Sequence, residues 1–426
     1  MAMVMAMAMG MAVKQRAVEA KRQMPRFLFA YRLCLSVVAA LALYHATSAV
    51  VINVVGDGLP PSIIRFTGED GNIAALRADR LLAEAVGART SLAKVASLAR
   101  GALLTQPLNP RAVRILAFVA YADERSGHAD RLIDLSTQLS RRDFGAQLAL
   151  IERAVARNDI PAALRSYDVG LRTNPEGQNV LLPVLTTALG DAEVRQAFAP
   201  YYRRNPQWLV ALIGYALGPG NAATSIAQSI RAGGGLATGQ VYRDLETQVL
   251  ARLTEGGAAD EARAFFLSVH PQRADMLKRT DFDGEMVDPM LVPFSWRMAA
   301  KATMANDAAP DDQRKRAGIR LSAAPGEVGE LLAKIFFISP ENHRFSVSLA
   351  FDADVTSRGI DISVICATPT QDLLQRIIVE RGTSTTITSI PFNSNGRCRA
   401  IWLKLSGVNS SADLPVSVVV TEITLL

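Results

Sequence analysis

Residues 147–175 read QLALIERAVARNDIPAALRSYDVGLRTNP, and this stretch decides the fold of the central part of the chain. Leu148, Ile151 and Val155 recur at the spacing of one helix face, which predicts a short amphipathic helix. A second short helix follows and ends before Pro175, because proline cannot continue a helix. Helices of about three turns are unstable alone, so each must bury its apolar face against neighbouring helices.

The pattern recurs with a period of 34 residues. Four pairs of residues have this separation: Leu116 and Leu150, Ala120 and Ala154, Ala129 and Ala163, and Ile133 and Tyr167. Asn-Pro dipeptides at 109–110, 174–175 and 205–206 fall at the breaks between helices. Two short helices in 34 residues resemble the tetratricopeptide repeat.

The resemblance implies packing roles for particular residues. Leu150, Ala163, Tyr167 and Pro175 occupy the Leu, small, aromatic and Pro positions of one unit, and Leu116, Ala117 and Ala129 fit the preceding unit. Small residues let the two helices of a unit approach closely. The chain departs from the family at Val113 and Gln147, which replace a Trp, and at Ile151, which fills a usually small site.

We therefore expect a tetratricopeptide-like α-helical array over residues 72–280, with an irregular helical bundle as the alternative. An array of this kind presents a long curved surface with few ligand-specific groups, which suits protein partners. We expect envelope proteins to bind to it.

The hydrophobic period changes from 3.6 to 2 after residue 290. Phe345, Val347 and Leu349 alternate with polar residues, which is typical of a half-buried strand. Eight or nine such segments, separated by turn signals, predict an all-β sandwich of jelly-roll type over residues 292–426. Residues 281–291 are the expected linker.

Three residues of the predicted sandwich are candidates for particular roles. Cys366 and Cys398 lie at strand ends and are expected to form a disulfide outside the cytoplasm, which leaves Cys34 unpaired. Trp402 stands between Ile401 and Leu403, so it is expected on the face opposite the core, as a glycan or partner contact. Packing against another part of the fold explains Trp402 equally well.

Residues 33–55 form an apolar run without Lys, Arg, Asp or Glu, long enough for a transmembrane helix. A basic, low-complexity segment (1–32) precedes it and a spacer (56–71) follows. The positive-inside rule then places the amino terminus in the cytoplasm and the later domains in the periplasm, with the lipid bilayer contacting residues 33–55 of a single-pass protein of the bacterial inner membrane. A cleaved signal peptide, giving a soluble periplasmic or secreted protein, is the alternative.

The net charge of +6 supports this topology. Residues 1–55 hold six Lys or Arg and one Glu, so five of the six net charges flank the apolar segment. The rest of the chain is close to neutral, and we expect no nucleic-acid partner.

Motifs for catalysis, metals and cofactors are not evident in the sequence. The four His are far apart, and the Ser-x-x-Lys at Ser91–Lys94 lacks an accompanying Lys-Thr-Gly. We expect a non-catalytic protein without a metal or cofactor. The alternative is a glycoside hydrolase using Asp352, Asp354 or Asp361 as acids.

The overall plan resembles a group of proteobacterial envelope proteins with one anchor, divergent tetratricopeptide repeats and a C-terminal sandwich. The sandwich here opens with Pro-Phe-Ser-Trp-Arg at 293–297. That group has no assigned biochemical activity and is sometimes associated with polysaccharide production or export. The resemblance implies a membrane-anchored periplasmic scaffold or adaptor that binds protein partners. The alternative is a carbohydrate-binding envelope protein acting through its sandwich.

Overall fold

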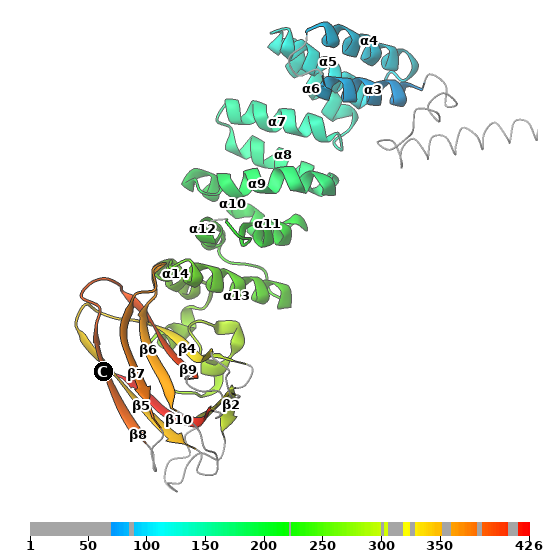
Figure 1. Cartoon of the computed structure of the whole chain (residues 1–426). Coiled ribbons are helices and arrows are strands. Elements are labelled where there is room, and N and C mark those ends of the chain that lie inside the picture. The colour runs from blue at the N-terminus through cyan, green and yellow to red at the C-terminus, as the bar shows by residue number, and fades with distance from the viewer. Residues whose placement is uncertain are drawn as a thin grey trace, which may run out of the picture. The chain divides into compact units, whose positions relative to one another are not determined.

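The structure is a computed structural model that describes residues 70–84, 89–220, 223–299, 302–305, 318–323, 329–351, 359–380, 386–407 and 416–426. The predicted membrane segment at 33–55 lies outside these ranges, and within them no helix has the length and apolarity needed to span a bilayer. The chain divides into two compact units, residues 1–153 and 154–426. Helices fill the middle of the chain and strands its C-terminal part, as predicted (Figure 1).

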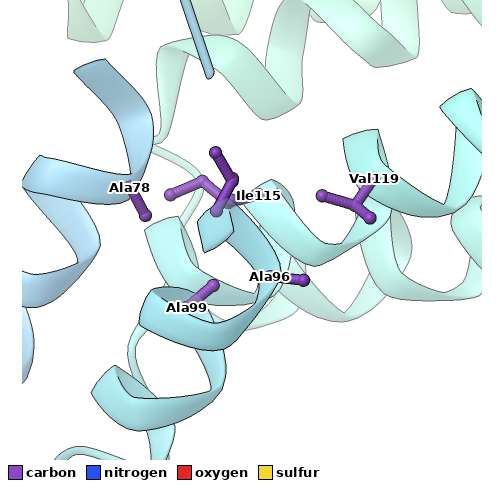
Figure 2. Packing of buried hydrophobic residues seen from close by; sticks show 6 residues of the cluster. Ala78, Ala96, Ala99, Ile115 and Val119 are labelled. Carbon is purple, nitrogen blue, oxygen red and sulfur yellow. The ribbon is translucent and has the colours of Figure 1, made fainter. Parts of the chain in front are cut away.

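The first unit is helical. Its elements are α3 (Gly71–Glu84), α4 (Arg89–Thr105), α5 (Pro110–Ala122), α6 (Ser126–Leu139) and most of α7 (Phe144–Ala156). Helix α3 packs on α4, and α5 packs on α6. Ala78, Ala96 and Ala99 form a buried cluster with Ile115 and Val119, and their small side chains let three helices approach closely (Figure 2).

A buried arginine joins three helical segments of this unit. The Arg114 side chain on α5 is 8% exposed and lies 2.8 Å from Asp79 on α3 and 2.7 Å from Asp143, just before α7. The start of α5 is well defined in the sequence. Asn109 caps the helix, and Pro110 is its first residue. Helix register is therefore fixed by polar contacts as well as by apolar packing.

The helices of the second unit alternate between two layers. They are α8 (Ile160–Thr173), α9 (Gln178–Ala188), α10 (Ala192–Arg204), α11 (Trp208–Ala216), α12 (Ala223–Gly233), α13 (Gln240–Glu255) and α14 (Ala259–Val269), with the 3₁₀ turn η1 (Pro175–Gly177) after α8. Helices α8, α10, α12 and α14 contact one another in sequence, and α9, α11 and α13 do the same. Helices α5, α7 and α9 begin 34 residues apart, as the sequence period predicts.

The segment between the helices and the sandwich is folded. It contains the 3₁₀ turns η2 (Pro271–Leu277), η3 (Gly284–Val287) and η4 (Pro289–Leu291). Phe282, Met286 and Leu291 are each at most 2% exposed. The residues expected to act as a linker therefore pack into the junction between helices and strands.

The sandwich has two five-stranded antiparallel sheets within the described ranges. Sheet A has the order β1 (Arg297–Met298), β4 (Glu330–Phe337), β9 (Ala400–Gly407), β6 (Ile360–Cys366) and β7 (Leu373–Val379). Sheet B has the order β2 (Ala302–Ala305), β3 (Gly318–Ala323), β10 (Val416–Leu425), β5 (Asn342–Phe351) and β8 (Thr386–Asn393). Strands β3 to β10 alternate between the sheets except at β6 and β7, which pair within sheet A, and this is the strand order of an eight-stranded jelly roll.

Aromatic side chains fill the space between the sheets. The rings of Phe336 on β4 and Phe345 on β5 lie edge to face with centroids 5.3 Å apart. Trp296, 1% exposed, packs against Phe336 and Phe282. The core therefore continues from the sandwich into the junction segment.

Candidate functional site

The outward side of sheet A gathers polar side chains around Trp402. Along β9, Ile401, Leu403 and Leu405 are buried, so Trp402 and Lys404 point to the opposite side. Strand pairing extends this side across all five strands of the sheet. We use the name charged face for eight residues on this side: Arg297, Glu330, Asp361, Ser363, Arg376, Trp402, Lys404 and Ser406. Apolar residues such as Ala333 and Ile335 lie between them on β4.

Trp402 lies beneath two cations. The Arg297 guanidinium carbon is 4.8 Å from the indole centroid, and Lys404 Nζ is 5.8 Å from it. Both distances suit cation–π attraction. The indole is only 6% exposed, so the expectation of an open Trp402 contact surface needs correction. The side chain is on the expected face, and Arg297 covers it.

Glu330 holds both cations in place. Its Oε1 lies 2.6 Å from Arg297 Nη2, and its Oε2 lies 3.4 Å from Lys404 Nζ. The Arg297 side chain is 39% exposed, so this ion-paired group faces solvent on one side. Arg297 belongs to a two-residue strand, and its contacts fasten that strand to β4 and β9.

A second ion pair lies on the other side of β9. Asp361 Oδ2 accepts hydrogen bonds from Arg376 Nε at 2.9 Å and pairs with Nη2 at 2.7 Å. The carboxylate raises the pKa of the Arg376 guanidinium. Asp361 Oδ1 is buried and has no hydrogen-bond partner among the described residues. It is an acceptor with unused capacity beside the hydroxyl-bearing residues Ser406 and Ser363.

The charged face is chemically suited to binding. Planar guanidinium and carboxylate groups fixed by ion pairs offer paired donors and acceptors, the complement of neighbouring hydroxyls on a ligand. Glu330 and Asp361 are separated by β9, which places their strands roughly 10 Å apart. Asp352 and Asp354 lie outside the described residues.

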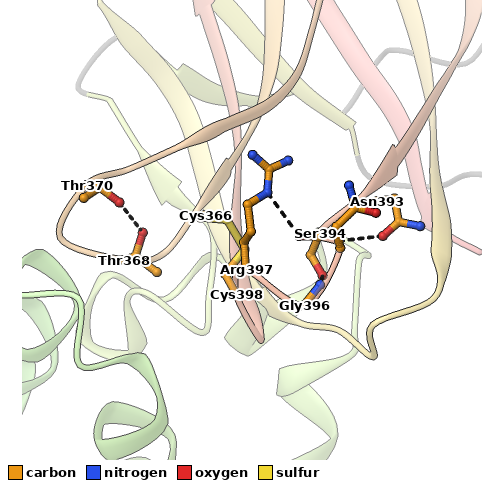
Figure 3. Close-up of a disulfide and its surroundings, with 9 residues drawn as sticks. Cys366, Thr368, Thr370, Asn393, Ser394, Gly396, Arg397 and Cys398 are labelled. Carbon is orange, nitrogen blue, oxygen red and sulfur yellow. Dashed lines mark hydrogen bonds between the residues drawn. A yellow bond between two sulfur atoms is a disulfide. The ribbon is translucent and has the colours of Figure 1, made fainter.

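The predicted cysteine pair is a disulfide in the structure. Cys366, the last residue of β6, and Cys398, just before β9, have an S–S distance of 2.07 Å and Cα atoms 5.7 Å apart (Figure 3). The bond lies at the base of the β6–β7 loop, which carries Thr368, Pro369 and Thr370. Cys34 lies outside the described residues.

The repeat residues lie in helix contacts. Ala129, Ala163 and Tyr167 are buried, with exposures of 0%, 5% and 7%. Leu116 and Leu150 are partly buried and pack against apolar clusters of the first unit. Pro175 is the first residue of η1, immediately after α8. These residues have packing positions in the helical part of the chain.

Among the residues that the structure places, no three His, Cys, Asp or Glu side chains converge on a metal position. Asp281 of the acidic segment is instead bound by Arg279, whose Nε and Nη2 lie 2.9 and 2.8 Å from its two carboxylate oxygens. That contact lowers the pKa of Asp281 against the opposing effect of its burial.

Sequence reasoning missed two contacts in the junction. Lys334 on β4 is fully buried, and Gly257 in the α13–α14 turn abuts Pro369. The only sequence signals are a Lys within the apolar run LLAKIFF and a Gly-Gly pair after α13. Neither signal identifies a distant partner.

Comparisons with known proteins found no matching family model and no matching curated protein. Among solved structures, the chain is similar to "carbohydrate-binding modules from the beta-sandwich super family", with 10% identity and a TM-score of 0.27 over 35% of this chain and 62% of that one. It is similar to the enzymatically active domain of bacteriophage CBA120 tailspike protein 4, with 8% identity and a TM-score of 0.24 over 31% of this chain and 19% of that one. The matches to these two structures span less than two thirds of their length.

A third similar structure is the EclA C-terminal domain, a sugar-binding protein. The match has 13% identity and a TM-score of 0.21, and covers 35% of this chain and 99% of that one. No function is transferred from likenesses at this level.

Proposed function

We propose that this protein is a membrane-anchored scaffold of the bacterial envelope that binds a protein partner through tetratricopeptide-like repeats. Residues 33–55 are its anchor, and the helices and sandwich lie in the periplasm. The support is the 34-residue spacing of successive helix starts together with the layered contacts of α8–α14. Stacked helical repeats characteristically present extended surfaces to other proteins.

The observation that carries the proposal is an exposed apolar pair on α9. Val180 and Val184 are 52% and 54% exposed, one turn apart on the same side of the helix. The opposite side of α9 is buried through Leu181, Leu182 and Leu185. Exposed apolar groups on a repeat helix are the type of surface that an amphipathic segment of another protein covers.

A close apolar contact holds the last helical hairpin, α13–α14, against the start of the sandwich. The Phe266 ring on α14 lies 4.5 Å from that of Phe294, centroid to centroid. Both rings are fully buried. A partner held on the helices of the second unit is therefore kept at a defined place relative to the sandwich.

The partner-binding proposal is tested with full-length protein in its native membrane. The variant Val180→Asp/Val184→Asp puts two charges on α9 and should abolish copurification of the partner. Ile387→Asp is the matched control, since Ile387 is 71% exposed on the sandwich. If both variants recover the same amount of partner, α9 is excluded as the partner-binding surface.

The anchor has its own test. Carbonate extraction should leave the full-length protein in the membrane pellet, because a transmembrane helix resists alkaline extraction. Release into the soluble fraction would favour the cleaved signal peptide. Release on carbonate extraction would not change the interpretation of the partner-binding test.

A second candidate function is carbohydrate binding by the sandwich. It is favoured by the fixed Asp361–Arg376 ion pair, whose arginine faces solvent beside Ser363 and Ser406 on the charged face. Neighbouring sugar hydroxyls would bind to the fixed carboxylate and guanidinium groups there.

Affinity electrophoresis in gels containing envelope polysaccharide tests this candidate. Asp361→Asn should reduce retention, while Ser389→Ala on β8 of the other sheet should not. If the unmodified protein shows no retention in any polysaccharide gel, the carbohydrate function is excluded.

A further inference from the structure

Lys334 connects three segments of the junction between the helices and the sandwich. It lies on β4 and has an exposure of 0%. Its Nζ donates a hydrogen bond to the Met276 carbonyl in η2 at 2.7 Å, and a second to the Phe294 carbonyl. Met276 belongs to the chain leaving α14, and Phe294 to the chain entering β1.

The two carbonyls can satisfy both N–H groups of an uncharged amine. A neutral lysine amine has two N–H donors, and an ammonium has three. Two carbonyls accept from Nζ, and the centroid of the Phe336 ring lies 5.1 Å from it. Burial lowers the pKa of Lys334 to about 7, with Asp281 opposing that change and Arg279 adding to it.

Opening the junction would return this amine to water. Lys334 is enclosed by the same segments that dock the last hairpin on the sandwich: the Phe266–Phe294 contact is adjacent, and Trp296 Nε1 donates to the Asp281 carbonyl at 2.9 Å. In water a lysine regains its usual affinity for a proton. When the hairpin docks, the amine must therefore either release its proton or carry its positive charge into the buried site.

We propose that Lys334 makes the docking of the α13–α14 hairpin on the sandwich sensitive to pH, so that docking strengthens as the pH rises above neutrality. The undocked amine binds a proton that the docked amine releases. The docking equilibrium then shifts by at most about tenfold per pH unit, between the docked and solvated values of the pKa. Below that window both states are protonated and the shift stops.

Other ionisable groups face the same junction. Asp281 and Arg279 are the charged groups that act on the pKa of Lys334. At the end of the hairpin, His270 Nε2 lies 4.0 Å from Glu246. In the turns that follow, Arg273 pairs with Glu285 at 2.9 Å. Burial lowers the pKa of His270 below its usual value, so His270 changes charge on the acid side of the proposed window.

Hydrogen exchange of the full-length protein tests the proposal. Protection factors, corrected for the intrinsic exchange rate at each pH, are measured for the junction amides, including Trp296 N–H, which donates to the Met286 carbonyl at 2.7 Å. We expect protection to rise up to about 100-fold from pH 7 to pH 9. Lys334→Met should abolish the rise, and His270→Gln should retain it.

Two results would overturn the proposal: no rise in the unmodified protein, or the same rise in Lys334→Met. If that variant does not fold, the amine is followed directly by NMR of selectively ¹⁵N-lysine-labelled protein. An amine that titrates near pH 7 supports the proposal, and only lysines titrating near 10 contradict it. The result does not depend on any partner or glycan.

Discussion

Gly257 and Pro369 are in contact across the junction between the last helical hairpin and the sandwich. A Cβ atom on Gly257 would lie 2.5 Å from the backbone nitrogen of Pro369, and closer still to its Cδ. Gly257 also has a φ of +73°, a conformation that favours glycine. The turn between α13 and α14 therefore packs directly against the β6–β7 loop.

Gly257→Ala should lower stability by about 2–4 kcal/mol, because a left-handed alanine costs about 1 kcal/mol and the displaced Pro369 adds the rest. Gly396→Ala is the control: Gly396 has a φ of +74°, and an alanine Cβ there would meet no other group within 4 Å. It should lose only about 1 kcal/mol. Thermal and urea unfolding measure the difference, and equal losses would argue against the contact.

The disulfide should stabilise the loop that supports this contact. Cys366 and Cys398 are 32 residues apart, so removing the bond by Cys366→Ala/Cys398→Ala should cost about 3–4 kcal/mol through the entropy of the unfolded chain. Calorimetry with and without reductant checks the value. A thiol count on denatured, unreduced protein should find one free cysteine, and three would contradict the bond.

Arg114 should matter more than an exposed arginine. Arg114→Met leaves the carboxylates of Asp79 and Asp143 without their buried partner and should cost about 3–5 kcal/mol. Arg125→Met breaks an exposed pair with Asp123 and should cost less than about 1 kcal/mol. Urea denaturation of the two variants compares them; similar losses would show that the Arg114 bridge contributes little.

Stability should depend on pH through Lys334. Its pKa of about 7 in the folded protein lies below the unfolded value of 10.5, so the unfolded state binds more protons between these limits. The free energy of unfolding should therefore rise by up to about 1.4 kcal/mol per pH unit from pH 7 upward, and this contribution should be constant below pH 7. Urea titrations at a series of pH values should show the slope in the unmodified protein and its loss in Lys334→Met.

Removing Arg297 should expose Trp402. Arg297→Ala takes away the guanidinium over the indole, so tryptophan emission should shift to longer wavelength and acrylamide quenching should increase. Arg376→Ala, on the same face but paired with Asp361, should leave the emission unchanged. A shift that persists in Arg297→Ala/Trp402→Phe would have to come from Trp208 or Trp296, contrary to this assignment.

Local periodicity was sufficient to predict most elements. The alternation at Phe345, Val347 and Leu349 predicts β5, and the one-face spacing of Leu148, Ile151 and Val155 predicts α7. The sandwich opens with only a two-residue strand, β1 at 297–298, because the chain before it turns to bury Phe294 and Trp296.

Long-range contacts were not predictable from the sequence. The alternation along β9 predicts the side on which Trp402 lies, but the side chain is covered by Arg297, more than 100 residues away in the sequence. Lys334 has the pattern of an ordinary strand lysine, and its burial depends on carbonyls of Met276 and Phe294. Such contacts follow from how segments pack, which a one-dimensional pattern does not contain.

Site-specific crosslinking at Val184 tests the central claim, a partner-binding surface on α9, most directly. A photoreactive amino acid replaces Val184 in the full-length protein, and a matched version carries it at Ile387. Irradiation of intact cells should yield a discrete crosslinked envelope protein from position 184 and none from position 387. No crosslink at 184, or the same products at both positions, would contradict the scaffold function.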